Sequence, residues 1–369
     1  MNWPYDEVIV AEVSNVDDPF YRARQQRLAA LLRADGLPGA LVSSREHVQY
    51  LTGHRPVYLR PGAAWLDADG AITLAVAGGD APPATVDRTI EYVVQKAGTL
   101  VDHAIGRAAA ALSEHVPNAG KIGFDALAAG GACEHVSIFP ALLKLRRTKD
   151  ELEVRLLRQS IAGVEAIYAH IRKVIAPGMT EVDVCAESHA AAVRACGCSI
   201  GWLGNDFQSN SGGGPPRHRK IEAGELMPLD LGLGPNGYIA DLCRTFCIGG
   251  EPTPLQRGAH RRILDVFDFI ELQLRPGVAC ADLHQQAIDH LHGFEGLSFD
   301  HHLGHGIGLN AHESPRLNKN WNDVLAAGDV ITIEPGLYGT ALRSGIRIEN
   351  DYLITEDGFE RLSNCSSDL

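Results

Sequence analysis

Apolar and polar residues in the first part of the chain alternate between helical and strand-like spacing. Helical spacing runs over Phe20–Leu32 and Val101–Leu112. Short apolar runs predict strands over Gly39–Ser44, Ile72–Ala77, Glu91–Gln95 and Lys121–Asp125, and the composition of Gly53–Val57 predicts a loop. This alternation predicts a small α/β domain whose strands are mostly buried.

A different pattern follows the charged stretch Leu145–Asp150, where a long helical segment extends to Ile175. Pro177 and Gly178 end this helix, and Thr180 with Asp183 three residues later predicts a capping box for the next one. Helices are also predicted over Ala259–Leu274 and Ala281–His292, followed by strands.

We therefore place a domain boundary near Arg147, giving an N-terminal domain of residues 1–146 and a C-terminal domain of residues 147–369. Helices and strands are segregated in the second domain, which favours an α+β arrangement with helices packed on one curved, mainly antiparallel sheet. The length of 369 residues also favours two domains over one.

The composition of the chain argues against two classes of partner, nucleic acids and membranes. The chain is 45% hydrophobic and 21% charged, as is typical of globular proteins, and its net charge of −13 argues against a nucleic-acid partner. We expect no membrane partner, because no window approaches the roughly 18 uninterrupted apolar residues of a membrane helix. The N-terminus lacks a signal pattern, so the eight cysteines favour reduced thiols and a cytoplasmic location.

The C-terminal half holds four carboxylates and one imidazole, each inside its own local pattern. Buried carboxylates are costly unless something positive pairs with them, and a pair of divalent metal ions meets that need. The five candidates are Asp230 and Asp241 in LDLGLGPNGYIADLCRTF, His305 in HHLGHGIGLNAHESP, Glu334 in TIEPGLY and Glu349 in GIRIEN.

The two aspartates flank a predicted hairpin. If its loop is the four residues from Gly234 to Gly237, Leu233 pairs with Tyr238 and Asp230 lies directly opposite Asp241. Their Cβ atoms would then be about 5 Å apart on one face, an arrangement that favours a cation between them. A bulge at Gly237 would shift the register by one, and two unrelated acids flanking a hairpin is the alternative interpretation.

His305 lies among glycines that allow the backbone to crowd a site. A lone histidine is more often structural than a ligand, but His301, His302 and His312 are close in sequence and favour a site. Glu334 follows a buried apolar run.

Glu349 belongs to the alternating stretch Ile346–Glu349, which directs it to the same face as Arg347. An exposed Arg–Glu pair on a strand is the alternative interpretation of these two residues.

With these residues assembled, the second domain resembles the pita-bread metallopeptidases, which include aminopeptidase P, prolidase and methionine aminopeptidase. The metal-free creatinase shares the two-domain version of this architecture. Ala40–Gly53 and Leu145–Glu151 resemble the N-terminal domain and the junction of the Xaa-Pro peptidase and creatinase branch. The resemblance implies a C-terminal pita-bread domain preceded by a smaller, creatinase-like α/β domain.

The resemblance implies roles for individual residues. Asp230, Asp241, His305, Glu334 and Glu349 match the metal ligands, with Asp241 and Glu349 bridging two ions. Asp230 would complete one ion, and His305 with Glu334 would complete the other. His301 and His312 match histidines that bind substrate and stabilise the transition state, and Tyr338 and Arg347 match positions adjoining the ligands. Mixed oxygen and nitrogen ligation suits manganese, cobalt, zinc or iron.

One segment departs from the family pattern. The loop Ser209–Lys220 is several residues short, and His218 lies only six positions before Gly224, where a family histidine would stand further upstream. Arg217, His218 and Arg219 either anchor a substrate carboxylate or form a solvated turn. Cys243 replaces the usual threonine.

The implied chemistry is amide hydrolysis by a hydroxide bridging two metal ions. His312 would support the oxyanion, and Glu334 would move a proton to the leaving nitrogen. An Xaa-Pro aminopeptidase or dipeptidase is the favoured function. The alternatives are a metal-dependent hydrolase or lyase acting on a small non-peptide molecule, and a non-enzymatic binding protein on the same fold.

The resemblance also implies a homodimer in which the N-terminal domain covers the neighbouring active site. Arg55 and Arg60 are then candidates to reach the substrate, and the alternative is that both are ordinary surface arginines.

Overall fold

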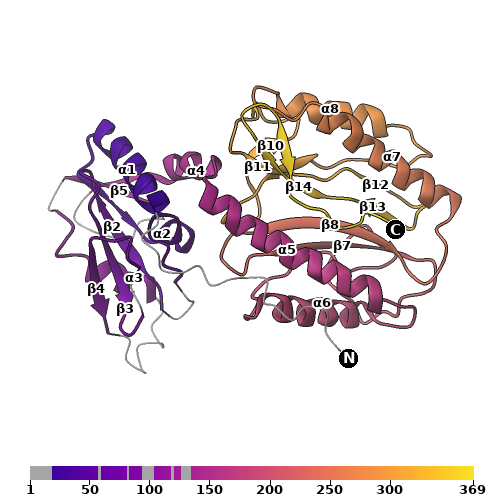
Figure 1. Ribbon diagram of the computed structural model, residues 1–369, viewed down its shortest axis with the longest axis horizontal. Coiled ribbons are helices and arrows are strands. Elements are labelled where there is room, and N and C mark those ends of the chain that lie inside the picture. The colour runs from indigo at the N-terminus through magenta and orange to yellow at the C-terminus, as the bar shows by residue number, and fades with distance from the viewer. Residues whose placement is uncertain (1–18, 57–59, 81–82, 94–103, 118–119, 126–133) are drawn as a thin grey trace. The chain divides into compact units, whose positions relative to one another are not determined.

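The computed structural model describes residues 19–56, 60–80, 83–93, 104–117, 120–125 and 134–369. The chain separates into two compact units, one that ends at Arg146 and one that runs from Arg147 to Leu369. Each unit has its own sheets and helices (Figure 1).

The N-terminal unit is built on a six-stranded mixed sheet in the order β4-β3-β2-β1-β5-β6. Strand β2 is antiparallel to β1 and β3, whereas the other neighbouring pairs are parallel. The elements are α1 (Pro19–Ala34), β1 (Gly39–Val42), α2 (Arg45–Thr52), β2 (Ala63–Asp67), β3 (Ile72–Ala77), β4 (Arg88–Tyr92), α3 (Ala104–Ala111), β5 (Lys121–Phe124), β6 (Glu134–Ser137) and α4 (Phe139–Arg147).

Most of the predicted elements in this unit are confirmed, including the helix at α1 and the strands at β1, β3 and β5. The strand predicted from Glu91 begins earlier, because Arg88–Tyr92 pairs in parallel with β3. The predicted helix from Val101 is confirmed from Ala104 onward, and residues 94–103 lie outside the described residues. The short elements α2, β2, β6 and α4 were not predicted.

The described C-terminal unit carries three antiparallel sheets. Two are the strand pairs β7-β8 and β12-β13, and the third has five strands in the order β10-β9-β11-β14-β15. Its elements are α5 (Glu151–Val174), α6 (Glu181–Cys196), β7 (Leu226–Leu233), β8 (Ala240–Cys247), α7 (Pro254–Glu271), α8 (Cys280–Leu291), β9 (Gly304–Gly306), β10 (Glu313–Leu317), β11 (Val330–Ile333), β12 (Gly336–Gly339), β13 (Ser344–Arg347), β14 (Asn350–Ile354) and β15 (Phe359–Arg361).

Two helix pairs cover these strands from opposite sides (Figure 1). Helix α5 packs on the β7-β8 hairpin and on α6, whereas α7 contacts β12 and β13 and α8 contacts β10. An apolar core of buried residues from α7, α8 and the strands fills the second interface. The sheets therefore lie in a layer between the two helix pairs, as expected for an α+β unit.

Local capping signals set where the long helices begin. The predicted capping box of Thr180 and Asp183 at the start of α6 is confirmed. The helix predicted from Ala259 begins earlier, at Pro254, because Thr253 and Gln256 form another capping box and proline suits the first helical position.

The predicted register of the β7-β8 hairpin is wrong by two residues. Leu233 pairs with Ala240, so Asp230 lies opposite Cys243 and Asp241 lies opposite Gly232. The connection lengthens to six residues (234–239), because its Asn236 side chain donates to the Leu156 carbonyl and its Ile239 N–H donates to the Gly308 carbonyl. Since side chains alternate with a period of two, both aspartates still project from one face.

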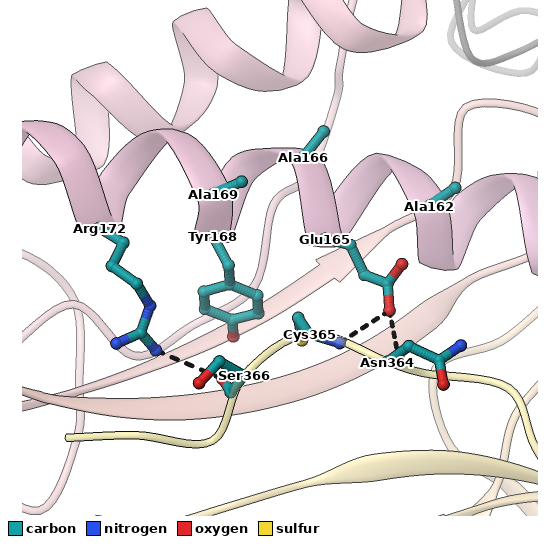
Figure 2. A pocket seen from close by; sticks show the side chains of 9 residues that line it. All are labelled: Ala162, Glu165, Ala166, Tyr168, Ala169, Arg172, Asn364, Cys365 and Ser366. Atoms are coloured by element: carbon teal, nitrogen blue, oxygen red, sulfur yellow. Dashed lines mark hydrogen bonds between the residues drawn. The ribbon is translucent and has the colours of Figure 1, made fainter.

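The C-terminal segment is held against α5 by two charged side chains (Figure 2). The Glu165 carboxylate accepts hydrogen bonds from the backbone N–H groups of Asn364 and Cys365. Arg172 donates to the carbonyls of Ser366 and Asp368 at 3.3 and 3.0 Å. The last residues of the chain are thereby part of the folded unit.

Across the described residues, none of the helices has the length and apolar composition needed to span a bilayer.

Candidate metal centre

Five side chains from separate segments of the C-terminal unit line one pocket. Asp230 and Asp241 project from β7 and β8, and His305 from β9. Glu334 directly follows β11, and Glu349 lies between β13 and β14. The structure thus brings together all five residues that the sequence selected as candidate metal ligands.

Their ligand atoms fall into two groups that share Glu349. Asp230, Asp241 and Glu349 offer one group, and His305, Glu334 and Glu349 offer the other, with the atoms of each group within 4.8 Å of one another. Asp241, His305 and His312 form a further such group. A shared carboxylate between two groups is the arrangement that suits two neighbouring cations.

The electrostatics of the pocket indicate that it needs added positive charge. Burial and the negative charges of Glu334, Asp241 and Asp230 raise the pKa of Glu349 well above its usual value. Burial and Asp230 likewise raise the pKa of Asp241. In the described part of the chain, the buried Oε2 atom of Glu349 has no hydrogen-bond partner. Divalent cations would meet each of these deficits, so the residues fit a metal centre.

Glycines on both sides of His305 let neighbouring strands approach it closely. A Cβ atom at Gly304 would overlap the Thr332 carbonyl, and one at Gly306 would overlap the Ser314 carbonyl. Burial lowers the pKa of His305 to about 4, which keeps its ring neutral at physiological pH. A neutral imidazole is the form that binds a metal ion.

His302 is a pocket residue to which sequence reasoning assigned no role. Its Nε2 atom lies 2.9 Å from Oε1 of Glu334. Burial would raise the pKa of Glu334, but the hydrogen bond from His302 and the nearby histidines outweigh it and lower that pKa to about 2. His302 therefore holds Glu334 ionised and oriented. Its position beside His301 was the available signal.

Arg347, Tyr338 and His301 form a hydrogen-bonded chain along one wall. Arg347 donates to Asp230 Oδ2 at 2.6 Å and to the Tyr338 hydroxyl at 3.0 Å. His301 Nδ1 lies 2.8 Å from the His302 carbonyl, which only accepts, so a neutral ring leaves Nε2 to accept from the Tyr338 hydroxyl at 3.0 Å. Burial lowers the pKa of His301 to about 4, consistent with that neutral ring.

His312 projects into the pocket beside His305, with ring centroids 3.8 Å apart. The turn that carries it is closed by Glu313, whose Oε1 accepts from the Asn310 N–H at 3.0 Å. Its Oε2 pairs with Lys149 Nζ at 3.2 Å, and both side chains are buried. This ion pair ties the start of α5 to the turn that presents His312.

Replacing Lys149 with methionine should lower the free energy of unfolding by about 3–5 kcal/mol, because Glu313 would stay buried without its counter-charge. Urea denaturation would measure the loss. Lys173→Met, at an exposed position of α5, is the matched control and should change stability by less than about 0.5 kcal/mol. A Lys149→Met, Glu313→Gln double variant should recover part of the loss; no recovery would show that the ion pair is not the cause.

The structure does not bring His218 into the pocket. His218 is exposed, and the flanking arginines are paired with glutamates: Arg217 with buried Glu181 at 2.6 Å, and Arg219 with Glu225. These ion pairs anchor this end of the short loop to Glu181 and Glu225. Both arginines are engaged in ion pairs and are not free to anchor a substrate carboxylate, whereas the exposure of Arg217 and His218 fits a turn at the surface.

Arg60, the other proposed substrate contact, pairs with Asp80 at 2.8 Å and donates to the Gly78 carbonyl within the N-terminal unit.

Asp206, Asn205 and Asp300 also line the pocket but were not selected from the sequence. Asp206 pairs with Arg347 and accepts from the Gly214 N–H at 2.7 Å, so it ties the short loop to the metal centre. Its only sequence signal is an acidic residue ahead of a glycine run. The contact with Arg347 depends on tertiary structure.

Comparison with known proteins places this pocket in a family. The model for metallopeptidase family M24 matches residues 155–356, which is more than half of the chain. The chain belongs to metallopeptidase family M24. The Creatinase/Prolidase N-terminal domain model matches residues 24–136. The predicted α+β pita-bread fold with a creatinase-like N-terminal domain is therefore confirmed, and the M24 protein is a metal-dependent hydrolase.

Individual relatives span most of its length. The "Probable dipeptidase PepE" of Mycobacterium tuberculosis is 30% identical over 372 residues, covering 94% of this chain and 96% of that protein. The Xaa-Pro dipeptidase of Pyrococcus furiosus is 33% identical over 234 residues, covering 62% and 65%. The structure of an Xaa-Pro dipeptidase from Bacillus anthracis superposes with a TM-score of 0.79 at 22% identity, covering 95% and 99% of the two chains, and so shares the fold.

Proposed function

We propose that this M24 protein is a dinuclear metal-dependent peptidase that cleaves the amide bond preceding proline in short peptides. The proposal rests chiefly on the two groups of candidate ligands that share Glu349. Asp230, Asp241 and Glu349 would hold one ion, and His305 and Glu334 would hold the other together with Asp241 and Glu349.

When bound, two divalent ions would lower the pKa of a shared water enough to supply hydroxide near neutral pH and would polarise the amide carbonyl. The protein's own residues would then handle protons and orientation. Glu334, held by His302, would carry a proton to the leaving nitrogen. His312, which projects into the pocket, would donate to the developing oxyanion. His301, Tyr338 and Arg347 would keep Asp230 in place.

The preference for proline is supported by relatives named as dipeptidases and Xaa-Pro dipeptidases. We also infer, on the family resemblance, a cytoplasmic homodimer. The metal could be manganese, cobalt, zinc or iron, because the donor set mixes oxygen and nitrogen.

Removing the metal should abolish hydrolysis. Protein treated with a chelator should not cleave Ala-Pro or Leu-Pro, and added manganese or cobalt should restore turnover. Release of free proline, followed with time, is the measurement. Ala-Gly and Leu-Gly are matched control substrates and should be cleaved at least about tenfold less efficiently.

Full activity after thorough chelation would rule out the metal mechanism. Turnover of the glycine peptides equal to that of the proline peptides would rule out the Xaa-Pro preference.

A further inference from the structure

Trp202 is a large apolar side chain that remains 38% exposed beside the metal centre. It lies on the segment that precedes Asp206, and that segment runs antiparallel to β7 through a bridge between Asp206 and Asp230. Its indole Nε1 donates to Asn205 Oδ1 at 3.4 Å, and Asn205 lines the pocket. None of the roles proposed above uses this indole.

The ring of Trp202 occupies the face of β7 that carries the ligands. A Cβ atom at Gly232 would overlap the ring, so the indole rests directly on the backbone of that glycine. Gly232 is two residues from Asp230, and its Cα partner on β8 is Asp241. Because alternate residues of a strand project to the same face, the indole lies on the same side as both carboxylates.

The side chains that line the pocket are mainly polar or charged. The described residues that line it are aspartates, glutamates, histidines, one asparagine, one tyrosine and one arginine. None of these lining residues is aliphatic. A peptide bound at the metal centre would therefore find its apolar contact at Trp202, at the edge formed by Asp230 and Asp241.

The position of Glu334 decides which part of a peptide meets the indole. Under the proposed function, Glu334 delivers a proton to the leaving nitrogen, so the proline lies toward Glu334 and His302. The acyl side, which is the Xaa residue, then extends in the other direction, toward Asp230 and Asp241.

We infer that Trp202 forms the apolar wall that receives the Xaa side chain and so makes the enzyme prefer large apolar residues at that position. The inference rests on the proposed peptidase function. Trp202 is a specificity residue, because it contacts the substrate side chain without taking part in bond cleavage.

A panel of Gly-Pro, Ala-Pro, Leu-Pro and Phe-Pro tests the inference. Wild-type kcat/KM for Leu-Pro or Phe-Pro should exceed that for Gly-Pro by at least about tenfold, the usual gain from an apolar contact. Trp202→Ala should reduce this ratio to within about threefold while Gly-Pro cleavage stays nearly unchanged. Trp202→Phe should keep most of the preference. Trp321→Ala, at another exposed tryptophan of the same unit, should keep all of it.

Stopped-flow fluorescence provides an independent readout. Mixing the metal-loaded enzyme with Leu-Pro should change the tryptophan emission in the wild type and in Trp321→Phe, but not in Trp202→Phe. A substrate ratio in Trp202→Ala equal to that of the wild type, or an emission change in Trp202→Phe as large as that of the wild type, would overturn the inference while leaving the peptidase function in place. No cleavage of any peptide by the wild type would instead overturn the proposed function, and the inference with it.

Discussion

Replacing Glu349 with glutamine should abolish turnover and the tight binding of both metal ions at once. Glu349 is the residue common to the two candidate ligand groups, so its loss removes one ligand from each. We expect at least a thousandfold loss of activity, which corresponds to about 4 kcal/mol of transition-state stabilisation. Proline release and metal content after dialysis are the measurements. Glu356→Gln, at an exposed glutamate nearby in sequence, is the matched control and should retain both.

In the metal-free protein, the same replacement should instead increase the stability of the fold. Burial and neighbouring carboxylates raise the folded-state pKa of Glu349 above its unfolded value. Its contribution to stability is therefore present at low pH and is lost as pH rises through the raised pKa. Near neutral pH, chelated Glu349→Gln should unfold at a higher temperature than chelated wild type. A lower unfolding temperature would contradict an unfavourable buried charge at Glu349. Retained activity would contradict a metal-binding role.

Arg244→Met should be the most destabilising single replacement proposed for this unit, by about 4 kcal/mol or more, because several buried acceptors would lose their donor. The Arg244 guanidinium is fully buried and donates to the carbonyls of Cys243 and Glu349 at 2.8 and 2.5 Å. It also donates to Asn350 Oδ1 at 2.8 Å and to the carbonyls of Cys365 and Ser366 at 3.1 and 3.0 Å. It thereby joins β8, the Glu349 segment and the C-terminal segment.

Urea denaturation of the metal-free protein would measure this loss without a contribution from ion binding. Arg244→Lys should rescue little, since an ammonium on a flexible stem cannot reproduce the planar set of donors. Arg275→Met, at an exposed arginine, is the control and should change stability by less than about 0.5 kcal/mol. A loss for Arg244→Met as small as that of the control would show that these hydrogen bonds are not important for the fold.

The helices and the candidate ligands could be predicted because their signals are local. The Thr180 capping box lies within four consecutive residues, and the glycines around His305 are its neighbours in the chain. The hairpin prediction shows the limit of such signals. Its turn residues predicted a tight reversal, but Asn236 and Ile239 bond to distant segments and lengthen the connection. The error of two residues preserved the face of both aspartates, so both still line the pocket.

The sequence alone thus determined which five residues could form the metal centre and where the main helices and buried strands lie, because these follow from periodicity and nearest neighbours. Only the tertiary structure decided how His302 holds Glu334, how Arg347 links Asp206 to Asp230, and that His218 does not line the pocket. Those features depend on hydrogen bonds and ion pairs between segments far apart in the chain. Such partners have no fixed spacing in sequence, so folding alone brings them together.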